Sequence, residues 1–184
     1  VARARLVSRL QGPLRERYAS VAPEHGDPRA TARYACSIPG FEPGQPRDEV
    51  AALLQAALVQ RRDEEFTRGI TLVGPHRDEL VLTLNEMPVK GYASHGESWS
   101  MALALRLASY DIIQSESGPG GDPILVLDDV FAELDSGRRE RLAAAVAGVD
   151  QVLVTAAVPA DVPPALAGRR VEVARGAARE VGHG

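Results

Sequence analysis

The sequence contains very few of the residues on which several classes of protein depend. Among its 184 residues, Cys36 is the only cysteine and Lys90 is the only lysine. A single cysteine excludes an intramolecular disulfide and a multi-cysteine metal site, and it fits a reducing compartment. A P-loop requires the pattern G-x-x-x-x-G-K-[ST], whereas Lys90 lies in Met-Pro-Val-Lys-Gly-Tyr. The sequence therefore contains no P-loop.

Long apolar runs and a secretory signal are also absent. The most apolar stretch, residues 99–113, is interrupted by Arg106 and Asp111, so nothing approaches the roughly 18 apolar residues of a membrane span. The chain starts Val-Ala-Arg-Ala-Arg, without an initiator Met and without the apolar segment of a signal peptide. We therefore expect a fragment or processed product, a cytoplasmic location and no membrane partner.

The composition indicates a folded α/β protein. Hydrophobic residues make up 45% of the chain and charged residues 25%, which is enough apolar material for a core and excludes the disordered class. The net charge of -4 argues against a wholly basic nucleic-acid module, although it leaves room for a local arginine patch.

Residues 1–68 are expected to form a mainly helical subdomain. Apolar residues at i, i+4 spacing predict helix in residues 1–22, divided into two short helices at Gly12-Pro13: Leu6, Leu10, Leu14 and Tyr18. Alternation over residues 33–38 predicts a strand with Tyr34, Cys36 and Ile38 on one face. Asp48 is expected to cap a helix with an apolar stripe from Val50 to Leu58 that ends near residues 61–65.

Residues 69–184 show the alternation of strands and helices that is typical of an α/β lobe. Strands are predicted over residues 70–73, 80–84, 124–127, 151–154 and 170–173, the last at an edge, and helices over 97–114 and 136–147. The unbroken aliphatic run 124–127 is typical of a parallel strand that is covered on both faces.

The first candidate site is the pair Asp128 and Asp129, which follows that aliphatic strand. Ligands of open α/β sheets bind beyond the carboxyl ends of the strands, and adjacent carboxylates suit a hydrated Mg²⁺. The structural alternative is a solvated strand end at which Asp129 begins a turn.

The second candidate site is Ser94-His95-Gly96-Glu97, just before the helix predicted over 97–114. A helix N-terminus attracts anions, and Gly96 has no side chain to keep a phosphate from the backbone. The same string is also a capping box, in which Ser94 and Glu97 satisfy each other's amides. The pattern by itself leaves both interpretations open.

Two further features have functional and structural alternatives. His76 and His95 are candidate nucleophile partners or metal ligands, but both lie in predicted turns, where histidines are usually solvated or bonded to the backbone. Arg77 can contact a DNA phosphate or pair with Asp78. The string Gly-Glu-Ser-Trp-Ser at residues 96–100 approaches the G-x-S-x-G elbow of hydrolases. A hydrolase is disfavoured because the last glycine is absent, no apolar strand precedes, and His183 is the only histidine after Asp128.

Taken together, three strings carry a family resemblance: Gly74–Leu80, Ser94–Glu97 and Leu127–Asp135, with Arg138 and Leu142 beyond. On these residues the chain resembles the C-terminal part of the RecF family, bacterial DNA replication and repair proteins. Their ATPase head is similar to those of ABC transporters and structural-maintenance-of-chromosomes (SMC) proteins. The resemblance implies an α/β fold, the C-terminal half of a P-loop ATPase head, with residues 1–68 as an arm and 69–184 as the lobe.

The resemblance also implies roles for individual residues. Asp128 resembles the Walker B aspartate that holds Mg²⁺ through water, and Asp129 the carboxylate that activates the attacking water. Ser94, Gly96 and Glu97 match the signature motif, which contacts ATP bound by the other subunit. Residues 132–135, ending in Asp135, match the D-loop at the dimer interface, and Thr155 follows the next strand. The Walker A half would lie in an upstream segment.

Two positions depart from the family pattern. Glu97 stands where Gln is usual, and a carboxylate about 4 Å from a phosphate oxygen repels it by roughly 1 to 4 kcal/mol. We therefore expect Glu97 to turn back into the capping box. Ala156 stands where ABC ATPases have a histidine after the Val-Thr of the strand, so hydrolysis is expected to be slow.

The resemblance implies an ATP-dependent DNA clamp for single-strand/double-strand junctions and gapped DNA. Its cofactors would be ATP and Mg²⁺, and its partners DNA, a RecR-type mediator and a second copy of the protein. The isolated chain is expected to be inactive, with weak ATPase activity only in the full-length protein. The alternative is a non-catalytic SMC-like scaffold or dimerisation module.

Overall fold

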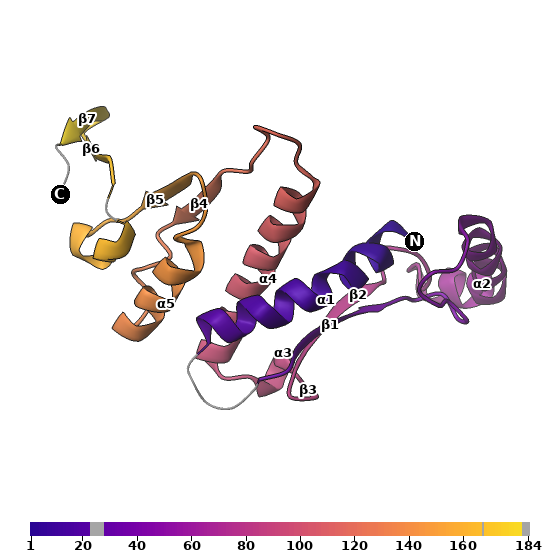
Figure 1. The fold of residues 1–184 in the computed structure, drawn as a ribbon. Coiled ribbons are helices and arrows are strands. Elements are labelled where there is room, and N and C mark those ends of the chain that lie inside the picture. Colours follow the sequence, from indigo (N-terminus) through magenta and orange to yellow (C-terminus); the bar gives the residue numbers. More distant parts are fainter. Residues whose placement is uncertain (23–27, 167, 182–184) are drawn as a thin grey trace. The chain divides into compact units, whose positions relative to one another are not determined.

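The computed structural model describes residues 1–22, 28–166 and 168–181 (Figure 1). Within these residues the chain folds as two compact units. Unit 1 contains residues 1–18 and 28–112, and unit 2 contains residues 19–22 and 113–181. Both sides of the predicted boundary at residues 68 and 69 lie in unit 1, and the division into arm and lobe stays a prediction. His183 lies outside the described residues.

Unit 1 is built around a small antiparallel sheet of three strands. Strand β1 (Ala30–Ala35) pairs along its whole length with β2 (Glu79–Leu84), which continues through a turn into β3 (Met87–Pro88). Helix α1 (Ala2–Val21) lies alongside β1 and β2 (Figure 1), and the side chain of Gln11 hydrogen-bonds to the Ala32 carbonyl. The sheet is thereby covered on one face, where Ala30 and Ala32 are buried.

Helix α1 contradicts the prediction of two short helices, because it runs unbroken through Gly12 and Pro13. A proline inside a helix costs about 3 kcal/mol. Against this, Leu10, Leu14 and Tyr18 are buried on one face, and burying each such side chain contributes roughly 1.5 to 3 kcal/mol. Packing along a continuous apolar stripe therefore outweighs the local break.

Strand β1 also differs from the prediction, since it covers residues 30–35 rather than 33–38. Tyr34 belongs to it, whereas Cys36 and Ile38 lie beyond its end. The amide of Ser37 donates to the carboxylate of Asp78 at 2.7 Å, a bond to a side chain where a strand would have bonded to backbone. Tertiary hydrogen bonding therefore ends the strand early.

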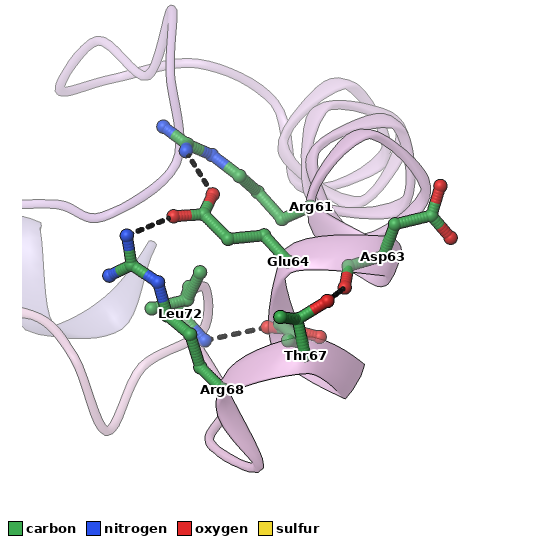
Figure 2. A network of polar contacts seen from close by, with 7 residues as sticks. Arg61, Asp63, Glu64, Thr67, Arg68 and Leu72 are labelled. Atoms are coloured by element: carbon green, nitrogen blue, oxygen red, sulfur yellow. Dashed lines mark hydrogen bonds and ion pairs between the residues drawn. The ribbon is translucent and has the colours of Figure 1, made fainter.

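Helix α2 (Arg47–Arg68) is longer at both ends than predicted. Asp48 lies in its first turn and does not cap it, because the helix starts after Pro46. Its charged end is stabilised by side chains one turn apart: Figure 2 shows Glu64 between Arg61 and Arg68, each 2.7 Å away. A left-handed Gly69 ends the helix.

The predicted strand at residues 70–73 is absent from the described structure. The Leu72 amide instead donates to the Glu65 carboxylate at 2.6 Å (Figure 2). Val73 is buried with Ile38 and Ala57 in a small core between α2 and the segment after β1. These residues are therefore fixed in a loop that packs on α2.

The remaining elements of unit 1 lead to its long buried helix. A four-residue turn, α3 (Val89–Tyr92), precedes α4 (His95–Glu116). As predicted, α4 is buried on several sides, and its buried residues include Met101, Ala104 and Leu107. It is held to α1 by a half-buried ion pair in which Nε and Nη2 of Arg17 donate to the Asp111 carboxylate, at 2.7 and 2.5 Å.

Unit 2 has a two-stranded parallel sheet with a crossover helix, as the sequence predicts. Strands β4 (Leu125–Asp128) and β5 (Val152–Thr155) flank α5 (Ser136–Val146). Two 3₁₀ turns, η1 (Pro159–Asp161) and η2 (Pro164–Leu166), lead to β6 (Arg170–Ala174). The predicted edge strand proves to be half of an antiparallel hairpin with β7 (Ala177–Val181).

The described residues cover only one face of the parallel sheet, which corrects the prediction that both faces would be covered. Leu127 is buried, whereas Val126 and its cross-strand neighbour Leu153 are about half exposed. None of the described helices has the length and hydropathy that crossing a membrane requires.

Candidate functional site

The carboxylate pair of unit 2 lies at the carboxyl end of β4 and is tied to the end of β5. The hydroxyl of Thr155 donates to Asp128 Oδ1 at 2.5 Å. The amide of Asp129 in turn donates to the Thr155 carbonyl at 3.2 Å and to its hydroxyl at 3.1 Å. One threonine therefore fixes one carboxylate and the backbone of the next.

Asp129 has a backbone conformation that few residues adopt. Its φ is +52°, in the left-handed region, which costs a residue with a side chain about 1 to 2 kcal/mol. Aspartate is among the residues that tolerate this region best. The strained conformation ends β4 directly after Asp128 and so gives the two adjacent carboxylates different backbone geometries.

The loop that follows is anchored by apolar side chains. Phe131 and Leu134 are buried, while Ala132 and Glu133 between them are exposed. Asp135 caps α5 by accepting from the Arg138 amide at 2.9 Å. This hydrogen bond lowers the pKa of Asp135 below its ordinary value. The loop is thus held at both ends and presents residues 132 and 133 to solvent.

The chemistry of this edge fits a magnesium ion that is bound in part by phosphate. Mg²⁺ usually takes one or two carboxylates and completes its shell with water and phosphate oxygens. Thr155 occupies only Oδ1 of Asp128, and Asp128 and Asp129 are both exposed. Among the described residues no cluster of three or more metal-ligating side chains exists. Protein side chains at this edge therefore supply only part of a metal coordination shell.

The second candidate site lies in unit 1, at the start of α4. The Ser94 amide and hydroxyl donate to Glu97 Oε2 at 2.8 and 2.7 Å, and the Glu97 amide donates back to Ser94 Oγ at 3.3 Å. These bonds lower the pKa of the Glu97 carboxyl. The predicted capping box is therefore confirmed, and the Glu97 carboxylate turns back as expected.

Capping leaves part of this helix end open to a ligand. The first amides of a helix have no partner within it, and the box satisfies the one at Glu97. The amides of His95 and Gly96 precede it in the first turn, where the helix dipole favours anions. A phosphate oxygen is the kind of ligand that this end accepts, although the capping box alone also explains the sequence pattern.

The predicted site residues fall into two groups. Asp128, Asp129, Asp135 and Thr155 lie together in unit 2, whereas Ser94, Gly96 and Glu97 lie in unit 1. The hydrogen bonds by which Thr155 links Asp128 and Asp129 were not predicted from the sequence. A signal existed, because a parallel register of the two aliphatic runs places Asp128 opposite Thr155. The hydrolase alternative fails, since residues 96–100 all lie inside α4 and form no strand-to-helix elbow.

Comparison with known proteins identifies close relatives, although no protein-family model matches the chain. The DNA replication and repair protein RecF of Streptomyces avermitilis is 54% identical over 176 residues, 96% of this chain and 45% of the relative. The RecF of Kineococcus radiotolerans is 51% identical over 96% of this chain and 48% of the relative. The chain thus spans just under half the length of these relatives.

Solved structures agree on the fold. The recombination mediator protein RecF-ATPrS of the RecFOR pathway superposes with a TM-score of 0.79 at 21% identity, over 98% of this chain and 46% of that chain. An SMC ATPase, studied for ATP-driven dimerisation, superposes with a TM-score of 0.52 at 15% identity, over 98% of this chain and 86% of that chain.

These likenesses confirm the predicted fold class, an α/β fold that corresponds to the C-terminal half of a P-loop ATPase head. The sequence identities of 51 and 54% extend over nearly the whole chain. The chain therefore belongs to the RecF family, and it corresponds to the C-terminal part of its members.

Proposed function

We propose that this chain supplies the Walker B, signature and D-loop residues of a RecF-type ATPase head that acts in DNA replication and repair in the cytoplasm. The observation that carries the proposal is the carboxylate pair at the end of β4, tied to Thr155. Two relatives support it: RecF structures have been solved with ATP and with ATPrS. The phosphate-cradling lysine of a P-loop would come from a segment outside this chain.

In this proposal Asp128 and Asp129 have different roles in ATP hydrolysis. Phosphoryl transfer depends mainly on positioning and on neutralising charge. Asp128, with one oxygen held by Thr155, would hold Mg²⁺ through water, and a bound Mg²⁺ would neutralise the phosphates. Asp129 would accept a proton from the attacking water, and Thr155 would orient that water. Because Ala156 follows Thr155, no histidine assists there, and turnover would be slow.

The signature and D-loop residues would act across a dimer. Ser94 and Gly96 would meet the γ-phosphate of ATP held by a second copy, with the α4 dipole favouring the anion. The exposed residues 132 and 133, with Asp135 behind them, would lie at the contact between copies. ATP-dependent dimerisation would clamp gapped or junction DNA and cooperate with a RecR-type mediator to load a recombinase.

The test is ATP hydrolysis and ATP-dependent dimerisation of the full-length protein with Asp129→Asn. A catalytic base contributes about 10²- to 10⁴-fold, so the variant should dimerise with ATP and lose at least about 100-fold in hydrolysis. Asp122→Asn is the matched control, because Asp122 is an exposed aspartate in the loop before β4.

Two results would count against the proposal. Equal hydrolysis by Asp129→Asn and the parent protein removes the assigned role of Asp129. Dimerisation with ATP but without any hydrolysis by the parent protein favours the alternative, a non-catalytic scaffold or dimerisation module. If ATP changes neither property, the nucleotide assignments fail together.

A further inference from the structure

The turn Gly74–Asp78, which precedes β2, is held by several independent hydrogen bonds and exposes its residues 75–77. The Arg77 amide donates to the Gly74 carbonyl at 2.8 Å and closes the turn. Ser37 Oγ lies 3.0 Å from both the amide and the carbonyl of Gly74. A surface turn fixed to this extent has a constant shape, which is a property of binding loops on a rigid scaffold.

The only carboxylate of this turn points inward. Asp78 accepts from the Ser37 amide at 2.7 Å, from the Ser37 hydroxyl at 2.9 Å and from the Tyr34 hydroxyl. Arg77 donates instead from Nε to the Thr71 carbonyl at 2.6 Å. The sequence left open whether Arg77 pairs with Asp78, and in the described structure it does not.

A second arginine reaches the same turn from α1. Arg3 donates from Nη1 to the Pro75 carbonyl at 2.5 Å. Beside it, His76 Nε2 lies 2.6 Å from the Thr71 hydroxyl. At residue 74 φ is +133°, a backbone conformation that favours glycine, and a Cβ there would lie 2.9 Å from the His76 ring. Arg3, His76 and Arg77 are all exposed.

The hydrogen-bond partners of these two arginines differ from those of several other arginines in the described structure. Arg17, Arg61 and Arg139 each form an ion pair with a carboxylate, which neutralises their charge. Arg3 and Arg77 each donate to a neutral carbonyl oxygen, and Arg3 also hydrogen-bonds with the Tyr34 hydroxyl, which itself donates to Asp78. Each guanidinium is therefore oriented by neutral groups. The nearest exposed carboxylate in sequence, Glu79, begins β2 opposite Ala35.

We propose that Arg3, His76 and Arg77, displayed by the turn Gly74–Asp78, form a contact surface for the phosphate backbone of DNA. This inference rests on the proposed function, in which DNA is the partner. Oriented guanidinium groups bind phosphate oxygens well because their N–H donors match the oxygen geometry. This surface would contact the sugar-phosphate backbone of DNA and not the edges of the bases, so it would position the protein on DNA of any sequence.

The experiment measures DNA binding by the full-length protein as a function of salt. Each phosphate neutralised by an arginine contributes about 0.9 to the slope of log K against log salt on duplex DNA. Arg3→Ala/Arg77→Ala should therefore lower the slope by about 1.8 on a fluorescent gapped duplex. Arg61→Ala, which removes an ion-paired arginine, is the matched control and should leave the slope unchanged.

Two single substitutions at Arg77 test the same inference if the double variant folds poorly. Arg77→Lys retains the charge and should keep most of the slope, whereas Arg77→Gln should lose about 0.9 of it. A slope that all these variants share with the parent protein overturns the inference. If the parent protein binds no DNA at low salt, the proposed DNA function fails as well, which is a distinct result.

Free nucleotide offers the same phosphate chemistry and needs its own measurement. ATP-dependent dimerisation of Arg3→Ala/Arg77→Ala should equal that of the parent protein. Loss of ATP-dependent dimerisation with unchanged DNA binding would assign the turn to nucleotide phosphates and overturn the proposal.

Discussion

Two of the sheets formed by the described residues, β1–β2–β3 in unit 1 and β4–β5 in unit 2, differ in how much of their surface is covered. In β1 of the antiparallel sheet, the buried Ala30 and Ala32 alternate with the exposed Thr31 and Arg33. The parallel β4–β5 sheet is aliphatic on both faces, and Val126 and Leu153 remain about half exposed. Parallel sheets are stable when both faces are covered. The difference is that the buried face of the β1–β2 sheet is backed by its polar face, whereas the β4–β5 sheet leaves an aliphatic face open among the described residues.

The largest effect on the free energy of unfolding is expected from substitutions on the two faces of β4. Leu127→Ala removes a buried side chain and should cost about 2 to 5 kcal/mol, whereas Val126→Ala on the exposed face should cost under about 1 kcal/mol. Chemical denaturation of the 184-residue chain measures both. In the full-length protein we expect the cost of Val126→Ala to rise toward about 2 kcal/mol, and equal costs of both substitutions in the short chain would contradict the comparison.

A second effect on stability concerns the half-buried hydrogen-bond network of Asp78, Tyr34 and Ser37 in unit 1. Partial burial acts to raise the pKa of Asp78, but hydrogen bonds from Tyr34 and Ser37 outweigh it and lower the pKa. A lowered folded-state pKa stabilises the protein above about pH 4, the unfolded value, and this stability is lost as the pH falls through the folded value. Asp78→Asn should therefore cost about 1 to 3 kcal/mol at pH 7.

Thermal melting across pH checks this network. The difference between Asp78→Asn and the parent protein should shrink below about pH 4. Burial and the Asp78 carboxylate raise the pKa of Tyr34 to about 12, so stability should also fall between about pH 10 and pH 12 in the parent protein. Tyr34→Phe removes this alkaline loss. A pH-independent difference for Asp78→Asn would show that the carboxylate is not the stabilising form.

The two helix caps give a smaller contrast. Ser94→Ala in unit 1 removes the hydroxyl that donates to Glu97 Oε2 and accepts from the Glu97 amide. Asp135→Ala in unit 2 removes the acceptor of the Arg138 amide and a 3.5 Å ion pair between Arg138 and the exposed Asp135 carboxylate, which contributes little. Caps are worth about 0.5 to 2 kcal/mol, and we expect Ser94→Ala to lie toward the upper end. Hydrogen exchange of the first turns of α4 and α5 measures each cap separately, and the opposite order would contradict the comparison.

The smallest effect is expected from Glu97→Gln in the full-length protein. Gln can keep the hydrogen bonds of the box while removing a charge near the proposed phosphate. Screened repulsion of about 1 kcal/mol corresponds to a roughly fivefold gain in ATP-dependent dimerisation, measured by light scattering. Glu49→Gln, at an exposed position of α2, is the control. A loss of dimerisation would assign the Glu97 carboxylate a direct role.

Local patterns predicted the elements whose stabilising partners lie nearby in the sequence. The capping box at Ser94 and Glu97 spans four residues, and the structure forms it as predicted. Strand β2, helix α4 and the β4–α5–β5 unit likewise follow their hydrophobic periodicity. The roles of the site residues come from the family resemblance, and they remain predictions.

What the sequence by itself determined is therefore the set of local elements and the candidate residues at their ends. Only the tertiary structure decided that α1 continues through Pro13, that β1 ends before Ser37, and that Asp78 turns inward while Arg77 faces solvent. The physical reason is the same in each case. A buried side chain or a hydrogen bond between residues far apart in sequence contributes 1 kcal/mol or more, roughly as much as the local preference that it overrides.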